Sequence, residues 1–456
     1  MKLQNISKEM LNNLENLGYK ELTPIQNIAI PPILKGKDII AQAKTGSGKT
    51  AAFGIGVIEK ITTKENHIQA IILCPTRELA EQVSKEIRLL ARAKANCKIL
   101  LLSGGHSFGY QLRSLKHGAH IIVGTPGRVL KHLKKESLVV DKLKFLVLDE
   151  ADRLLDMGFI EEIENIINYT PTTRQTLLFS ATFSNEIKSI SRRFQNSPIE
   201  VKAPILHSNE IIKQYFYNTE NSNKDEALIS LFSYYKPNSA IIFCNTKIKA
   251  TQIANMLQIN SIDALEIHGD MEQIDRRETL IQFANNSIKV LVATDVAARG
   301  LDIKSVECVI NYDFPLSKES YIHRIGRVGR AGESGIALSL ITQKDNIVIE
   351  ELKESINNIE ERNLETINSK NRDFSIRGDK DTICIYAGRK DKLRAGDILG
   401  SIIKSGGFEN SVIGKIDIND RYSYIAIDKE VSDKVFNYLQ NNRIKNRKFK
   451  VEFIQH

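Results

Sequence analysis

The run Ala43-Lys44-Thr45-Gly46-Ser47-Gly48-Lys49-Thr50 decides the fold class, because it has the composition of a phosphate-binding loop. An apolar, strand-like stretch (38–41) precedes it, and a helix-like stretch (51–55) follows it. Small residues let backbone N–H groups converge on phosphate oxygens, and a helix N-terminus adds its positive dipole end. Lys49 can reach the outer phosphates and the Thr50 hydroxyl can ligate magnesium. An ordinary glycine-rich turn would explain the glycines, but not Lys and Thr at these two positions.

Length, charge and cysteine content narrow the class of protein. A chain of 456 residues predicts about three domains, and 42% hydrophobic residues suffice for packed cores. The net charge of +9 favours a polyanionic partner. Five scattered cysteines without a C-x-x-C pair indicate small core residues in a reducing compartment. No apolar run reaches the roughly 18 residues of a membrane span and no signal-peptide core is visible, so we expect a cytoplasmic protein without membrane contact.

Short β-branched runs alternate with helix-length segments over most of the chain, which predicts an α/β fold with parallel, doubly wound sheets. The first series of expected strands is 38–41, 70–74, 99–102, 121–124, 145–148 and 176–179. The second series is 240–244, 264–267, 289–293, 308–311 and 335–341. We therefore expect two tandem α/β domains, at residues 1–205 and 208–358.

The C-terminal part has a different pattern. Residues 359–380 are polar and lack clear periodicity, which is typical of a linker. Residues 381–456 then follow the order β-α-β-β-α-β, the ferredoxin-like pattern of RNA-recognition domains. The expected strands and helices are 382–387, 395–403, 413–418, 422–427, 431–439 and 449–453. The fold class is completed by this small α+β domain.

Two further runs carry candidate chemistry. Asp149-Glu150-Ala151-Asp152 follows a buried strand, and carboxylates there lie at the ligand-binding edge of an α/β sheet. We assign Asp149 to the metal and Glu150 to the attacking water; an acidic helix cap is the alternative for this run alone. In the second domain, Arg327 and Arg330 are spaced to aim at one phosphate once the domains close over ATP, whereas a solvated basic turn is the alternative.

The ordered set of motifs resembles the DEAD-box RNA helicases over about 350 residues. The first-domain motifs are Gly18-Tyr19 through Thr23-Pro24-Ile25-Gln26, A-K-T-G-S-G-K-T (43–50), P-T-R-E-L-A (75–80), Gly104-Gly105, T-P-G-R (125–128), D-E-A-D (149–152) and S-A-T (180–182). The second-domain motifs are I-F-C-N-T (242–246), Gln273 with Arg276, A-T-D-V-A-A-R-G-L-D (293–302) and H-R-I-G-R-V-G-R (323–330). The resemblance implies two RecA-like domains, RNA-stimulated ATP hydrolysis, and ATP and Mg²⁺ as cofactors.

The resemblance also implies roles for individual residues. Gln26 would read adenine, Asp302 would bind the ribose, and Arg327 and Arg330 the γ-phosphate. The ATP site would comprise Tyr19, Thr23, Gln26, Ala43, Lys44, Thr45, Gly46, Ser47, Gly48, Lys49, Thr50, Gly300 and Asp302. Catalysis would fall to Lys49, Asp149, Glu150, Arg327 and Arg330, with Thr50 and Asp149 on the metal. Coupling of hydrolysis to domain closure would fall to Asp152, Ser180, Thr182 and His323.

An RNA groove is implied in the same way, with contacts to phosphate and 2′-OH that carry little sequence information. Its residues would be Pro75, Thr76, Arg77, Gly104, Gly105, Thr125, Gly127, Arg128, Arg276, Thr294 and Asp295. The family usually has an adenine-stacking aromatic upstream of the Gln26 motif, and no aromatic precedes Tyr19, so weaker nucleotide affinity is expected. Val328 stands where threonine is more frequent.

The tail resembles the RNA-binding domain of one bacterial branch of this family, which acts in assembly of the large ribosomal subunit. That implies large-subunit (23S) rRNA and pre-ribosomal particles as partners. In the last strand, apolar residues alternate with basic ones, so one face packs and the other offers charge. The candidate RNA contacts there are Lys445, Arg447, Lys448 and Lys450. A charged edge strand that discourages aggregation is the alternative.

We therefore interpret the chain as an ATP-dependent RNA helicase that locally unwinds RNA duplexes. Two alternatives stay open: a cold-shock or RNA-decay DEAD-box helicase with a similar tail, and an ATP-gated RNA clamp that holds RNA without unwinding it. The same motifs serve all three. The residues leave the oligomeric state open, with a monomer favoured.

Overall fold

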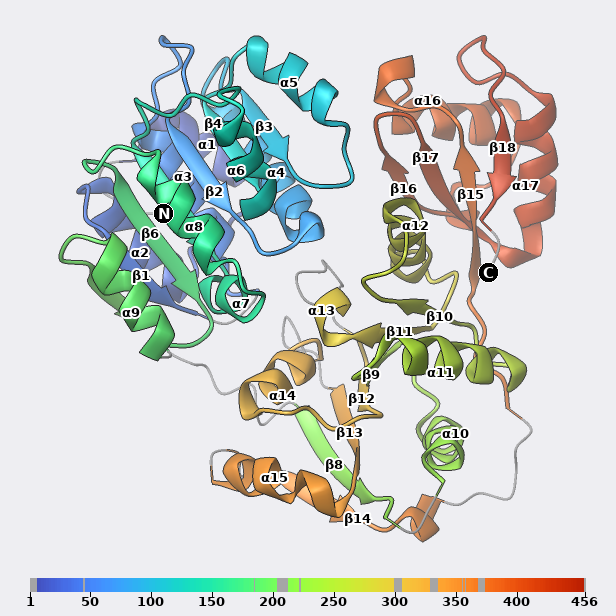
Figure 1. Ribbon diagram of the computed structural model, residues 1–456. Coiled ribbons are helices and arrows are strands. Elements are labelled where there is room, and N and C mark those ends of the chain that lie inside the picture. The colour runs from blue at the N-terminus through green and yellow to red at the C-terminus, as the bar shows by residue number, and fades with distance from the viewer. Residues whose placement is uncertain are drawn as a thin grey trace. The chain divides into compact units, whose positions relative to one another are not determined.

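The computed structural model describes residues 6–43, 46–183, 185–202, 212–220, 223–298, 306–328, 335–354, 356, 358–367 and 374–454. They form two compact units, one holding the described residues up to Lys202 and the other those from Ile212 onward (Figure 1). Within these residues, no helix is both long enough and apolar enough to cross a membrane.

The first unit is a seven-stranded sheet in which every pair of neighbours is parallel, in the order β3-β4-β2-β5-β6-β1-β7. Its strands are β1 (Ile39–Gln42), β2 (Ala70–Leu73), β3 (Ile99–Leu102), β4 (Ile121–Gly124), β5 (Phe145–Asp149), β6 (Gln175–Ser180) and β7 (Ile199–Lys202). Its α-helices are α1 (Lys8–Asn16), α2 (Pro24–Leu34), α3 (Lys49–Lys60), α4 (Arg77–Leu90), α5 (Phe108–Lys116), α6 (Pro126–Lys134), α7 (Ala151–Asp156), α8 (Ile160–Asn168) and α9 (Asn185–Phe194).

Successive residues of the central strands enter two separate cores, one on each face of this sheet. Val147 packs in a core with residues of α1 to α4, whereas Leu146 and Leu148 pack in a core with residues of α6 to α9. This double burial explains why the strands lack a polar face and read as continuous apolar runs.

The second unit begins with another seven-stranded parallel sheet, in the order β10-β11-β9-β12-β13-β8-β14. Its strands are β8 (Ile212–Asn218), β9 (Ala240–Cys244), β10 (Ala264–Ile267), β11 (Val290–Thr294), β12 (Cys308–Asn311), β13 (Gly335–Ile341) and β14 (Ile359–Arg362). Its α-helices are α10 (Lys224–Tyr235), α11 (Lys247–Ile259), α12 (Gln273–Ala284), α13 (Asp295–Ala298), α14 (Lys318–Ile325) and α15 (Asn346–Lys353). The expected fold class of two tandem parallel-sheet domains is confirmed.

The second unit ends in a four-stranded antiparallel sheet with the order β16-β17-β15-β18, the ferredoxin-like arrangement that the sequence predicts. Its elements are β15 (Lys380–Ile385), α16 (Ala395–Gly400), a π-helical turn (Ser401–Ser405), β16 (Ile413–Ile418), β17 (Ser423–Asp428), α17 (Lys429–Asn441) and β18 (Val451–Phe453). Ile383, Ile385, Ile425 and Val451 pack on one face against Ile398 of α16 and residues of α17.

Three strands escaped the sequence prediction, and one changes the expected linker. β7 and β14 are edge strands with polar side chains, and β8 carries Lys213 and Gln214, so none reads as an apolar run. The segment expected as a linker at 359–380 begins with β14, which pairs with β8. Ile367 and Ile376 then pack into the core of the second sheet, so this segment covers the domain instead of spanning a gap.

The other face of the small sheet packs on α12 of the same unit. Ile281 of α12 forms an apolar cluster with Cys384 of β15 and Tyr424 of β17. The Tyr424 hydroxyl donates to Glu278 Oε1 at 3.2 Å, and Asn285 Nδ2 donates to Thr382 Oγ1 at 3.1 Å. The small domain is therefore fastened to the second parallel-sheet domain.

Candidate nucleotide and RNA site

The phosphate-binding loop requires glycine at two positions. Gly46 and Gly48 have φ values of 83° and 91°, the left-handed region that side chains disfavour. A Cβ on Gly48 would also lie 2.4 Å from Gln26 Nε2. Gly48 caps α3, whose first residue is Lys49, so the loop delivers the lysine at the helix N-terminus that the sequence predicts.

Gln26 is buried against this loop and is held at both ends of its amide. Its Nε2 donates to the Gly48 carbonyl at 3.2 Å, and its Oε1 accepts from the Thr23 N–H at 2.9 Å. Each amide atom can make one more hydrogen bond. Gln26 is thus oriented beside the loop with one donor and one acceptor position left, and Thr23 is the residue that sets its direction.

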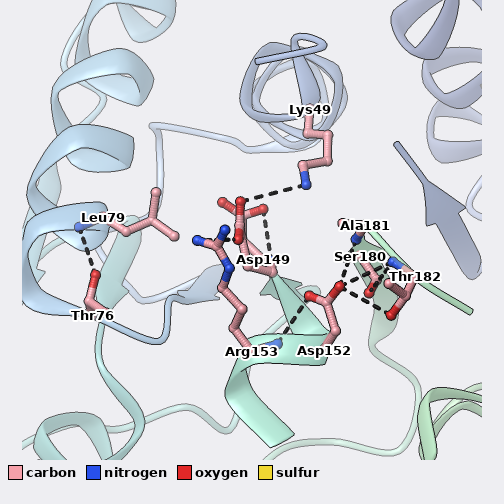
Figure 2. Close-up of polar contacts among 10 residues, drawn as sticks. Lys49, Thr76, Leu79, Asp149, Asp152, Arg153, Ser180, Ala181 and Thr182 are labelled. Carbon is pink, nitrogen blue, oxygen red and sulfur yellow. Dashed lines mark hydrogen bonds and ion pairs between the residues drawn. The ribbon is translucent and has the colours of Figure 1, made fainter. Parts of the chain in front are cut away.

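The acidic run lies where β5 ends. Glu150 has a φ of 52°, an uncommon conformation for this residue type, and it caps the start of α7. Lys49 Nζ lies 3.7 Å from Glu150 Oε1, and Arg153 Nη1 lies 2.7 Å from Glu150 Oε2. All three side chains are buried (Figure 2). The strand and the loop, far apart in sequence, therefore place Lys49 and Glu150 together, as the two motifs predict.

Asp149 is buried on the same edge, and burial raises its pKa to about 7 against the opposing effect of the Lys49 charge. A buried carboxyl that is costly to ionise fits a site that receives a cation. Among the described residues, no cluster of three or more His, Cys, Asp or Glu could hold a metal alone. Magnesium usually keeps several waters and takes one or two protein ligands plus phosphates, so Asp149 and Thr50 fit that ion.

Asp152 connects the acidic run to the Ser180–Thr182 motif at the end of the neighbouring strand β6. Its Oδ2 accepts hydrogen bonds from the Ala181 N–H at 3.0 Å, the Thr182 N–H at 3.1 Å and the Thr182 hydroxyl at 3.3 Å (Figure 2). The Ser180 hydroxyl accepts from the Thr182 N–H at 3.3 Å. One carboxylate therefore holds three donors of the S-A-T turn, which brings together three of the four residues predicted to couple hydrolysis to closure.

The predicted RNA residues of the first domain follow the carboxyl ends of β2, β3 and β4, which are neighbours in the sheet. Thr76 caps α4 by accepting from the Leu79 N–H at 3.2 Å. A Cβ on Gly104 would lie 2.5 Å from Arg77 Nε, so glycine makes room for that guanidinium. Arg128 Nη1 donates to the His106 carbonyl at 2.9 Å and to Gln111 Oε1 at 2.7 Å. The sheet topology thus gathers these residues at one edge.

In the second unit, the sequence prediction missed Arg324, which is buried. Its Nε and Nη2 each donate to a carboxylate oxygen of Asp295 at 2.7 Å. It also donates to Asn311 Oδ1 and Asn245 Oδ1 at 3.1 Å and stacks over Phe243. The Asp295 carboxylate, expected in the RNA groove, is therefore bound to this arginine. The available signal was position, because Arg324 lies three residues before Arg327 in the same arginine-rich run.

Other predicted residues of the second unit are placed less closely. Arg276 Nη1 donates to the His268 carbonyl at 3.1 Å, Thr294 ends β11, His323 lies on α14, and Arg327 is buried. Five predicted site residues lie outside the described residues: Lys44, Thr45, Gly300, Asp302 and Arg330.

The basic residues near the C-terminal strand are exposed, and three have acidic neighbours. Lys445 Nζ lies 3.3 Å from Asp397, Arg447 Nη2 lies 3.5 Å from Asp391, and Lys450 pairs with Glu452. Lys448 is exposed and forms no ion pair among the described residues. Sequence reasoning missed Tyr386 and Tyr422, whose rings meet edge to face with centroids 5.4 Å apart beside Lys450.

Three family models match successive parts of the chain: the DEAD/DEAH box helicase model at residues 23–190, the helicase conserved C-terminal domain at 223–332, and the DbpA RNA binding domain at 382–453. The ATP-dependent RNA helicase DbpA of Escherichia coli K12 is 44% identical over 449 residues, covering 98% of this chain and 97% of the relative. The protein of that name from Bacillus subtilis 168 is 41% identical over 468 residues, with the same coverage.

Among solved structures, Dbp5 of S. cerevisiae bound to RNA and ADP BeF3 is similar with a TM-score of 0.71 and 29% sequence identity. The match covers 80% of this chain and 95% of that one.

Proposed function

We infer the finer function from one premise: the chain belongs to the DEAD-box ATP-dependent RNA helicases of the DbpA type. We propose that it unwinds short RNA duplexes locally and that large-subunit (23S) rRNA in pre-ribosomal particles is its target. We also propose that the boundaries 1–205, 208–358 and 381–456 delimit the three domains, with 359–380 connecting the last two.

The observation that carries the proposed chemistry is the sharing of Glu150 between Lys49 and Arg153 at the end of β5. When ATP binds, its outer phosphates compete for the Lys49 amine, and Glu150 loses one of its two cations. The Glu150 carboxylate can then accept a hydrogen bond from the attacking water and orient it toward the γ-phosphate. Magnesium, held by Asp149 and Thr50, would neutralise charge that develops on the phosphates.

Coupling to RNA follows from the Asp152 contacts. The S-A-T turn is bound to the same short segment that carries Glu150, so a shift at one end of β5 must displace the other. The RNA residues at the ends of β2, β3 and β4 offer hydroxyl groups, arginines and exposed backbone, which suit contacts to phosphates and 2′-OH groups. These contacts grip RNA without reading its sequence, so selectivity must come from elsewhere in the chain.

We assign selectivity to the tail. Its match to the DbpA RNA binding domain and its exposed basic residues support this, and they favour the DbpA-type reading over a cold-shock helicase. The face of its sheet that carries Tyr424 is occupied by α12, which leaves the basic strand end and the Tyr386–Tyr422 edge to meet RNA.

Two measurements on the full-length chain test the proposal. RNA-stimulated ATPase activity should half-saturate at a lower concentration of 23S rRNA than of an unrelated transcript of equal length. Release of a short labelled duplex should require ATP, and Glu150→Gln should bind ATP yet hydrolyse it orders of magnitude more slowly. ATP-dependent RNA retention without strand release would favour the clamp alternative instead. A Glu150→Gln variant that hydrolyses ATP near the wild-type rate would contradict the assigned mechanism.

A further inference from the structure

Arg153 directly follows the D-E-A-D run, and none of the assigned roles uses it. Its side chain is 1% exposed, although arginine is rarely buried without a partner. Among the described residues its one ion pair is with Glu150, at 2.7 Å, and its guanidinium hydrogens find no well-aligned hydrogen-bond acceptor. A buried cation in this state is balanced through Glu150.

The two cations around Glu150 differ in distance and in freedom to move. Arg153 Nη1 lies 2.7 Å from Oε2, whereas Lys49 Nζ lies 3.7 Å from Oε1. Lys49 begins a different helix at the phosphate-binding loop, so phosphate can draw its amine away. Arg153 lies three residues after Glu150 in the first turn of α7, where such side chains are neighbours (Figure 2). Arg153 therefore stays with Glu150 when Lys49 leaves.

The backbone of Glu150 makes an anchor necessary. With a φ of 52° it lies in the left-handed region, which side-chain-bearing residues adopt only when surrounding contacts impose it. The Glu150 carboxylate direction depends on the same contacts. Once Lys49 has turned to phosphate, Arg153 is the remaining cation among the described residues that fixes that direction.

We propose that Arg153 is a positioning residue, which holds the Glu150 carboxylate on the attacking water after Lys49 has moved to the phosphates. This proposal rests on the role of Glu150 proposed above. A purely structural buried ion pair is the alternative: it would lower stability when broken but leave turnover per folded molecule unchanged.

The first test compares Arg153→Gln and Arg153→Lys in the full-length chain by RNA-stimulated ATPase kinetics. We expect Arg153→Gln to lower kcat about 10- to 100-fold, with KM for ATP changed less than about threefold, because misplacing a reacting group costs rate more than binding. Arg153→Lys should fall between it and the wild type, since lysine keeps the charge but lacks the planar fork. Arg174→Gln is the matched control, because that partly buried arginine of the same domain contacts only backbone carbonyls of Pro171 and Phe194 in its printed bonds.

The second test asks whether Arg153 acts through Glu150. Adding Arg153→Gln to Glu150→Gln should slow single-turnover hydrolysis no further, because the carboxylate it positions is already gone. An additional tenfold loss, or an unchanged kcat in a folded Arg153→Gln protein, would overturn the proposal. If Arg153→Gln does not fold, a wild-type kcat in Arg153→Lys overturns it. A Glu150→Gln enzyme that is still active would instead refute the role of Glu150 itself, so the two failures are distinguishable.

Discussion

Asp152 and Thr182 are joined by two hydrogen bonds, 3.1 Å to the threonine N–H and 3.3 Å to its hydroxyl. These bonds cross from the start of α7 to the turn after β6, two segments that flank neighbouring strands. They make the turn geometrically dependent on the acidic run.

The first prediction tests that dependence. Thr182→Val removes the hydroxyl but keeps the size of the side chain and the backbone bonds to Asp152. We expect strand release to fall at least fivefold more than RNA-stimulated ATP hydrolysis, because the hydrolytic groups on β5 stay in place. The measurement is a paired ATPase and duplex-release assay on one preparation. Equal losses in both activities would show that the contact supports the fold and does not couple hydrolysis to unwinding.

Arg324 and Arg377 provide a matched pair of arginine–aspartate contacts that differ in burial. Arg324 is 1% exposed with Asp295 at 2.7 Å, whereas Arg377 is 56% exposed with Asp263 at 2.8 Å. Arg324→Met should destabilise the second unit by about 3–5 kcal/mol, because it leaves the partly buried Asp295 unpaired. Arg377→Met should cost about 1 kcal/mol or less. Urea unfolding of both variants checks this, and similar free energies of unfolding would contradict it.

His132 predicts a specific acid sensitivity of the first domain. It is buried, stacks on Phe108, and lies within hydrogen-bond distance of Ser137 and Gln111. Burial lowers its pKa from 6.5 to about 4, with further lowering by the charges of Arg128 and Lys131. Between these values the unfolded chain takes up a proton that the folded chain does not, so stability falls as the pH falls from 6.5 toward 4.

The test compares the free energy of unfolding at pH 7 and pH 5. His132→Gln should lose about 2 kcal/mol less than the wild type across this interval, because it has no histidine to protonate on unfolding. His106→Gln, at an exposed histidine of the same domain, is the control variant. An unchanged difference between the two pH values in His132→Gln would show that His132 does not set the acid sensitivity.

Tyr424 and Tyr422 separate docking of the tail from its other properties. Tyr424 is fully buried and donates its hydroxyl to Glu278 of α12. Tyr424→Phe should weaken docking by about 1–3 kcal/mol, because Glu278 loses a hydrogen bond in a partly buried place. Amide hydrogen exchange in α12 and β15 should speed up in Tyr424→Phe and stay unchanged in Tyr422→Phe. Identical protection in both variants would exclude a role for this hydrogen bond in docking.

The strands with continuous apolar runs could be predicted from the sequence to within one or two residues, because burial on both faces leaves no ambiguity. The edge strand β14 could not, since its Glu360, Glu361 and Arg362 look like a solvated linker. The motifs also predicted that Lys49 and Glu150 would meet. The sequence could not show that Arg153 and Arg324 are buried, because arginine is normally exposed and only the tertiary fold brings their carboxylate partners within reach.

The last prediction concerns RNA selection by the tail, and the docked interface decides how to test it. Deleting residues 381–456 would expose Ile281 and leave Asn285 without Thr382, so a loss of function could reflect damage to the second domain. Charge reversal in the intact chain avoids this. Lys448→Glu is the most direct change, because Lys448 is exposed, forms no ion pair among the described residues, and precedes β18.

We expect Lys448→Glu to raise the half-saturating concentration of 23S rRNA severalfold and to flatten its salt dependence, because a phosphate contact releases a counterion when it forms. Half-saturation by an unrelated transcript of equal length should change less, since the groove of the two parallel-sheet domains grips any backbone. Lys434→Glu makes the same charge change at an exposed position of α17 and serves as the control. Equal shifts for both RNAs, or for both variants, would show that the basic strand end adds only general attraction and does not select rRNA.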